Sequence, residues 1–126
     1  MTTKTKNIIH WSLAGVVGFI FLGSAINKFM GGEEALAMAG SIGLDENSFK
    51  ILGVIELISV LLFILPRTGI LGTLLLTAYM GGAIATHLTH SQSVFGPAVI
   101  EAIIWIAAMV RFPEITSRIS GSQKNE

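Results

Sequence analysis

The chain has 126 residues, of which 52% are hydrophobic and only 13% are charged. A soluble domain carries about a quarter of its residues as charges, so this sequence lacks a water-compatible surface and indicates a lipid environment. The net charge is zero and the basic residues are dispersed, which argues against a nucleic-acid partner, while the absence of cysteine excludes disulfides, thiolate catalysis and iron–sulfur ligation.

Four apolar stretches are predicted to span the membrane as helices, because each approaches the roughly 20 residues that cross about 30 Å of hydrocarbon. We expect these helices at about 8–28, 49–65, 69–88 and 97–112. Pro66 and Arg67 leave almost no linker between the second and third helices, so neighbours must run antiparallel. Pro97 suits a helix start, and Pro113 cannot extend the last helix. The sequence predicts an all-α, four-helix transmembrane bundle that occupies the whole chain, 1–126, as one domain.

The segment from Gly31 to Lys50 differs from the spans because it mixes four acidic residues with a short apolar run. We expect a short amphipathic element at the membrane interface, with Ser48 as a candidate helix cap. The tail from Ser117 to Glu126 is polar and is predicted to be mobile.

The distribution of lysine and arginine predicts the orientation, since positively charged loops stay on the cytoplasmic side. With four crossings, six basic residues share one side and two share the other with four carboxylates. The two groups are Lys4, Lys6, Arg67, Arg111, Arg118 and Lys124 against Lys28 and Lys50. Both termini are therefore expected in the cytoplasm, with Trp11 and Arg111 at the cytoplasmic interface.

Small residues spaced by four recur in the predicted helices, and such spacing lets helix backbones approach closely in lipid. The pairs are Ala14 and Gly18, Gly23 and Asn27, Gly69 and Thr73, and Gly81 and Ala85. The alternative for any one pair is that glycine is simply common in membrane helices.

Four ionisable side chains fall in the outer half of the predicted spans, where such groups are rare and costly. They are Lys28, Glu56, His87 and Glu101. Glu56 lies roughly 8 Å inside the second helix, too deep for its short side chain to reach water, and Lys28 is its expected ion-pair partner. Snorkelling toward the head groups is the alternative for Lys28 and His87, and hydration is the alternative for Glu101.

Two aromatic residues are expected beside these groups. Trp105 follows Glu101 by four residues and shares its helix face, and Tyr79 belongs to a stripe beside His87. Such a site suits a small polar head group above an apolar tail. The predicted ligand-binding residues are Lys28, Glu56, Tyr79, His87, Glu101 and Trp105, of which Glu56 and His87 are the best catalytic candidates.

Haem and metal sites are disfavoured by the positions of the histidines. His10 lies at the inner end of the first helix and His87 at the outer end of the third, so one haem iron cannot bind both. His87, His90 and Glu101 are an alternative metal site, but His90 lies in a polar loop, where a solvated histidine is the usual state. We therefore predict no bound metal.

The run from Arg67 to Leu88 resembles the third-helix signature of the DoxX-like family of small bacterial membrane proteins. The segments 23–28 and 53–56 are similar to the family's patterns in the first and second helices, and Pro97 with the segment 105–113 is similar to its fourth helix. The resemblance implies a four-helix bundle in the bacterial cytoplasmic (inner) membrane. The family residues that carry over are Lys28, Glu56 and His87.

The resemblance implies two functions. Members are associated with quinone-dependent membrane oxidoreductase assemblies, which suggests a subunit that binds a small amphiphile such as a quinone, with Glu56 and His87 exchanging protons and Lys28 fixing the carboxylate. The wider superfamily includes membrane chaperones, which suggests a non-enzymatic scaffold that binds a partner's helices or a second copy of itself. The cofactor, and whether the chain is an enzyme, stay open. A proton-coupled transporter would place polar groups at several depths, and the inner half here is nearly bare.

Overall fold

The computed structural model describes residues 1–121, which form six helices and no strand. In chain order the helices are α1 (Thr3–Met30), α2 (Glu33–Ser41), α3 (Glu46–Ile64), α4 (Gly69–Thr89), α5 (Phe95–Arg111) and α6 (Pro113–Ser120). Helices α1, α3 and α4 are each long and apolar enough to cross a membrane, whereas α5 reaches that length only together with α6, which is bent from it by 102°. The predicted all-α membrane bundle is confirmed.

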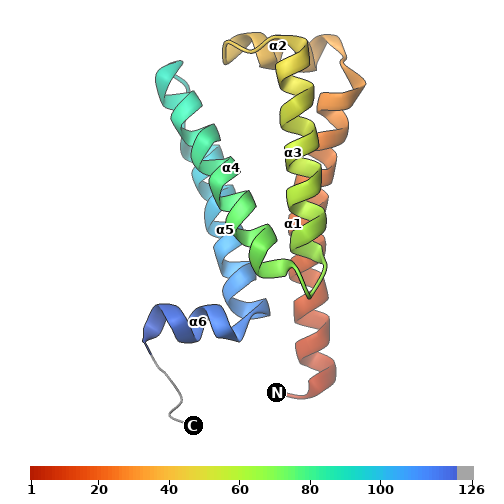
Figure 1. Ribbon diagram of the computed structural model, residues 1–126, viewed down its shortest axis with the longest axis vertical. Helices are drawn as coiled ribbons and strands as arrows, with labels where there is room; N and C mark the ends of the chain where they lie inside the picture. The colour runs from red at the N-terminus through yellow and green to blue at the C-terminus, as the bar shows by residue number, and fades with distance from the viewer. Residues whose placement is uncertain (122–126) are drawn as a thin grey trace.

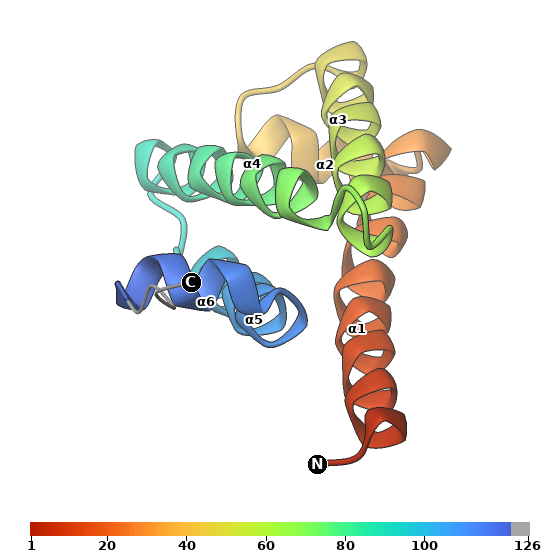
Figure 2. The same ribbon diagram turned by 60° about the horizontal axis from the view of Figure 1, so that its bottom comes forward.

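The bundle is splayed (Figure 1). Helices α1 and α3 pack side by side, α4 packs against α5, and α3 meets α4 at the turn that joins them. Phe63 and Gly72 meet at this closed end. From it the two pairs diverge toward an open end that contains α2 and the loop from α4 to α5 (Figure 1). Both views show α1 running past the closed end toward the N-terminus (Figures 1 and 2).

Local hydrogen bonds set where the helices begin. The Asp45 carboxylate accepts a hydrogen bond of 2.8 Å from the backbone N–H of Ser48 and so caps α3. Hydrogen bonding from the Ser48 side chain, and then from its backbone N–H, lowers the pKa of Asp45 below its ordinary value. The prediction that Ser48 is the cap was wrong, because Ser48 supplies the amide group and Asp45, three residues earlier, supplies the acceptor.

The closed end is held together by two contacts that require glycine. A Cβ atom at Gly72 would overlap the backbone of Phe63, so α3 and α4 touch main chain to main chain there. A Cβ at Gly69 would overlap the ring of Phe112. The apolar core around these contacts contains Val17, Phe21, Val60, Phe63, Leu76, Met80, Ile104, Ala107, Ala108 and Phe112.

The four small-residue pairs have two different environments. Ala14 with Gly18 and Gly69 with Thr73 are buried in helix contacts. The other two pairs, Gly23 with Asn27 and Gly81 with Ala85, are exposed, and a Cβ added at either glycine would meet no atom within 4 Å. Only half of the pairs therefore serve packing inside the bundle.

Arg111 was predicted to lie at the membrane interface, but its side chain turns into the closed end and is 5% exposed. Its guanidinium donates hydrogen bonds to the carbonyls of Phe63 at 2.9 Å and Ile64 at 3.1 Å, which are the last carbonyls of α3. The rings of Phe63 and Phe112 flank it. A cation in this position satisfies free carbonyls and offsets the negative end of the helix dipole. Trp11, by contrast, is exposed.

Pro113 separates α5 from α6 and occupies the first turn of α6, where its missing N–H costs nothing. The tail that was expected to be mobile therefore begins as helix, since residues 117–120 belong to α6. The remainder of that prediction, and Lys124 in the charge count, lie outside the described residues.

Candidate functional site

A cavity of about 670 Å³ lies between the diverging helices toward the open end. Pockets that bind small ligands have volumes of about 300–1,000 Å³ and mostly apolar walls with a few polar groups. All four long helices and α2 contribute side chains to this cavity, and most of these side chains are apolar. The polar ones are Ser24, Lys28, Glu56, Tyr79, Thr86, His87 and Gln92.

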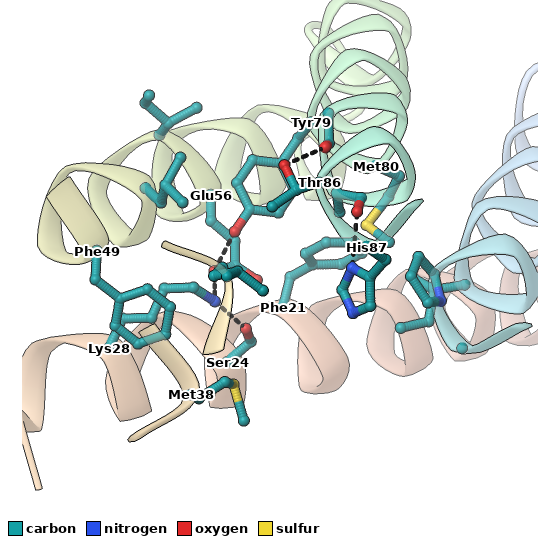
Figure 3. Close-up of a pocket in the computed structure, with 18 of the residues that line it drawn as sticks. Phe21, Ser24, Lys28, Met38, Phe49, Glu56, Tyr79, Met80, Thr86 and His87 are labelled. Atoms are coloured by element: carbon teal, nitrogen blue, oxygen red, sulfur yellow. Dashed lines mark hydrogen bonds and ion pairs between the residues drawn. The ribbon is translucent and has the colours of Figure 1, made fainter. Parts of the chain in front are cut away.

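A buried ion pair stands at the polar side of the cavity (Figure 3). Glu56 on α3 is 1% exposed, and its Oε2 lies 2.8 Å from Nζ of Lys28 on α1. Lys28 Nζ also donates to Ser24 Oγ at 2.6 Å and lies 5.3 Å from the centre of the Phe49 ring. A Cβ at Gly53 would approach Lys28 Cβ to 3.1 Å, so the glycine lets the lysine lie across α3. Each charge thereby offsets the desolvation of the other.

Glu56 also contacts the other helix pair of the bundle, through α4. The Tyr79 hydroxyl on α4 donates to Glu56 Oε2 over 3.4 Å. The Tyr79 ring packs edge-on against Phe21, with 6.4 Å between the ring centres. Oε2 therefore receives hydrogens from two helices, whereas no donor among residues 1–121 bonds to Oε1. The Oε1 atom is left as an acceptor for a molecule in the cavity.

His87 presents a defined nitrogen to the same cavity. Its Nδ1 lies 2.7 Å from the backbone carbonyl of Ala83, one turn earlier on α4. Because a carbonyl can only accept, Nδ1 carries a hydrogen, and in this tautomer Nε2 is the acceptor nitrogen. Figure 3 shows the imidazole and the Glu56 carboxylate entering one space from α4 and α3.

The structure brings together four of the six predicted ligand-binding residues, namely Lys28, Glu56, Tyr79 and His87. The other two, Glu101 and Trp105, are not among the cavity-lining residues. Trp105 Nε1 donates to Glu101 Oε1 at 3.1 Å, as their shared helix face allows, and Trp105 lines a separate groove beside α6. The other oxygen, Glu101 Oε2, is buried without a hydrogen-bond partner among residues 1–121.

Sequence reasoning missed Ser24 and Gln92. Ser24 lies one helical turn before Lys28, and this spacing was a usable signal. Gln92 had no such signal, because its role depends on a distant contact: its Nε2 donates to the Ser41 carbonyl at 3.1 Å and ties the loop after α4 to the end of α2.

Helix α2 forms the wall of the cavity at the open end. Its residues Ala35 and Ala39 pack on Phe49, while Met38 and Ile42, at and just after its end, line the cavity. Figure 1 shows α2 lying across the top of α3. The element that was expected at the interface is therefore also part of the site.

The remaining histidines lie away from the cavity. His10 Nε2 is 3.4 Å from the Arg111 guanidinium at the closed end, and His90 Nδ1 is 2.9 Å from the Thr86 carbonyl in the loop after α4. Residues 1–121 contain no group of three or more side chains placed to hold a metal ion.

These features define a small helical membrane protein with a ligand-sized cavity at one end of its bundle. The family model of the DoxX-like family matches residues 12–110, and the chain belongs to that family. The resemblance drawn from the sequence is thereby confirmed. Comparison with curated proteins and with solved structures gives no match.

Proposed function

We propose that the protein binds a small amphiphile, a quinone in particular, in the cavity between α3 and α4, as the membrane subunit of an oxidoreductase assembly. The observation that carries this proposal is the buried pair of Lys28 and Glu56, which faces a mostly apolar cavity and leaves Glu56 Oε1 unbonded. Ionisable groups inside membrane spans are retained mainly where they serve a site.

The position of the cavity supports a ligand that is dissolved in the bilayer. Ile55 on α3 and Ala78 and Gly82 on α4 line the cavity and are exposed. In spanning helices, an exposed apolar surface contacts acyl chains. A molecule with an apolar tail can therefore enter between the two helices without passing through water.

The charge distribution supports an orientation with the open end toward the periplasm and both termini in the cytoplasm of a bacterial cell. Glu33, Glu34, Asp45 and Glu46 lie at the open end, and Lys4, Lys6, Arg67 and Arg118 lie at the other. The inner membrane is the location that the family resemblance implies.

In this proposal Glu56 and His87 accept and return protons, and Lys28 holds the carboxylate in place. Both residues line the cavity, Glu56 from α3 and His87 from α4 (Figure 3). The chain has no cysteine, so an electron donor or acceptor must come from a partner protein or from the ligand itself.

A second function, the docking of a partner's helices, is supported by a different observation. The pairs Gly23 with Asn27 and Gly81 with Ala85 are exposed, and neither glycine has a neighbour within 4 Å of an added Cβ. Small residues at this spacing allow close helix contacts in lipid. A partner membrane protein or a second copy of this chain could use them.

The two functions are separated by purifying the protein in lipid nanodiscs, extracting bound compounds and identifying co-purifying subunits by mass spectrometry. The amphiphile site predicts saturable binding of a decyl-substituted benzoquinone, which Glu56→Gln abolishes because the substitution removes the charge that holds Lys28. Glu101→Gln is the matched control and leaves binding unchanged. Wild-type affinity in Glu56→Gln would remove the cavity as the site, and a stoichiometric partner without any quinone binding would favour docking.

A further inference from the structure

The lysine and the carboxylate of the cavity wall are paired with each other. Among the residues that the structure describes, 1–121, Lys28 and Glu56 are the only lysine, arginine, aspartate or glutamate residues that line the cavity, and they are paired at 2.8 Å. A phosphate or ammonium head group would have to leave water without an unpaired counter-charge to receive it, which is strongly unfavourable. The head group that fits this cavity is therefore uncharged.

The donor and acceptor groups of the cavity wall differ in whether they already form hydrogen bonds. Lys28 Nζ donates to Glu56 and Ser24, and the Tyr79 hydroxyl donates to Glu56. The Ser24 hydroxyl accepts from Lys28, and its own hydrogen bonds to no acceptor among residues 1–121. Gln92 at the mouth donates to the Ser41 carbonyl.

Two of the acceptor atoms in the wall make no hydrogen bond within the described part of the chain. They are Glu56 Oε1 and His87 Nε2, neither of which bonds to any group among residues 1–121. Thr86 Oγ1 adds a further lone pair, because its hydrogen goes to the Gly82 carbonyl at 2.8 Å. A ligand that donates hydrogen bonds would satisfy these acceptors.

On the basis of the proposed amphiphile site, we infer that the cavity selects an uncharged head group that donates hydrogen bonds from hydroxyl groups, and so prefers a hydroquinone to the corresponding quinone. One hydroxyl bonds to Glu56 Oε1 and the other to His87 Nε2. The quinone sets its carbonyl oxygens against these two acceptors and satisfies neither. A site built to accept from a hydroxyl discriminates strongly against an analogue that lacks it, because its buried acceptors are then left unpaired.

The test compares three ligands on wild-type protein in nanodiscs under anaerobic conditions: a decyl hydroquinone, the decyl benzoquinone, and the dimethyl ether of the hydroquinone. The dimethyl ether keeps the shape and oxygens but has no hydroxyl hydrogen. We expect the hydroquinone to bind at least about tenfold more tightly than either other compound. Equal affinities, or tighter binding of the quinone, would overturn the preference and leave the amphiphile site standing, whereas no binding of any of the three would overturn both.

A variant locates the second acceptor. His87→Phe keeps an aromatic ring but removes Nε2, so it should lower the affinity for the hydroquinone toward that for the quinone while leaving the affinity for the quinone unchanged. His90→Phe alters a histidine that does not line the cavity and should leave all three affinities as in the wild type. A retained hydroquinone preference in His87→Phe would contradict the assigned role of His87.

Discussion

Replacement of Lys28 by methionine should strongly destabilise the protein, because it leaves the Glu56 carboxylate buried without its cation. At the observed 2.8 Å, the attraction between unit charges is about 6 kcal/mol at an effective dielectric constant near 20. Desolvation of both groups cancels much of this gain in the intact pair, but removing one partner of a buried pair costs about 3–5 kcal/mol. The Tyr79 hydroxyl, 3.4 Å from Glu56 Oε2, is a long and uncharged donor and does not replace the lost positive charge.

The chain offers a matched control. Lys50 and Glu46 form an ion pair of 3.1 Å one turn apart on α3, with side chains 43% and 51% exposed. Lys50→Met should cost less than about 0.5 kcal/mol, as surface pairs on helices do. The free energy of unfolding would be measured by circular dichroism during titration of mixed micelles with SDS. The double variant Lys28→Met with Glu56→Gln should lose less stability than Lys28→Met alone. Equal losses in the two lysine variants would refute the view that Glu56 is held by a buried charge.

Three further predictions concern the scaffold. Gly72→Ala should destabilise the protein by more than about 3 kcal/mol, because the new Cβ would overlap backbone atoms of Phe63 that cannot move aside. Gly81→Ala, by contrast, should be neutral or stabilising by up to about 1 kcal/mol. The same SDS titration measures both variants, and a tolerated Gly72→Ala would contradict the backbone contact. Arg111→Met should cost about 2–3 kcal/mol through the two carbonyls left unpaired at the end of α3, with Arg111→Lys between it and the wild type. The cap formed by Asp45 stabilises α3 as a carboxylate, so its contribution is fully present above the unfolded-state pKa and is lost as the pH falls through the lowered folded-state pKa; Asp45→Asn should remove this part of the pH dependence of the melting temperature, and an unchanged pH profile would argue against the cap.

The elements of the fold could be predicted because the bilayer constrains them so strongly. A helix must satisfy its own backbone in lipid and must be long enough to cross it, so α1, α3 and α4 follow from apolar length alone. The hairpin follows from Pro66 and Arg67. The splay could not be predicted, because it depends on which glycines meet a backbone: Gly72 does and Gly81 does not, although both belong to the same helix.

The site could be predicted only in part, for a related reason. Depth along a helix selected Lys28, Glu56, His87 and Glu101, since position in the chain determines depth directly. The first three line the cavity, whereas Glu101 does not. Depth does not determine which neighbouring helix a side chain faces. Trp105 therefore lines the groove beside α6 instead of the cavity. The contribution of α2 and Gln92 to the cavity depends on contacts between segments that are distant in sequence, which no local pattern encodes.

The main-chain contact at Gly72 joins the two helix pairs at the closed end, so a small change of angle there produces a larger displacement at the open end. His87 lies fifteen residues further along α4, about 22 Å from that contact at helical rise. A tilt of α4 by about 5° at the contact would therefore move the imidazole by about 2 Å. Glu56 lies on α3, in the other helix pair. Substitutions far from any ligand, at the point where the helix pairs are joined, would thus retune the spacing between the two acceptors and change which head groups can bridge them.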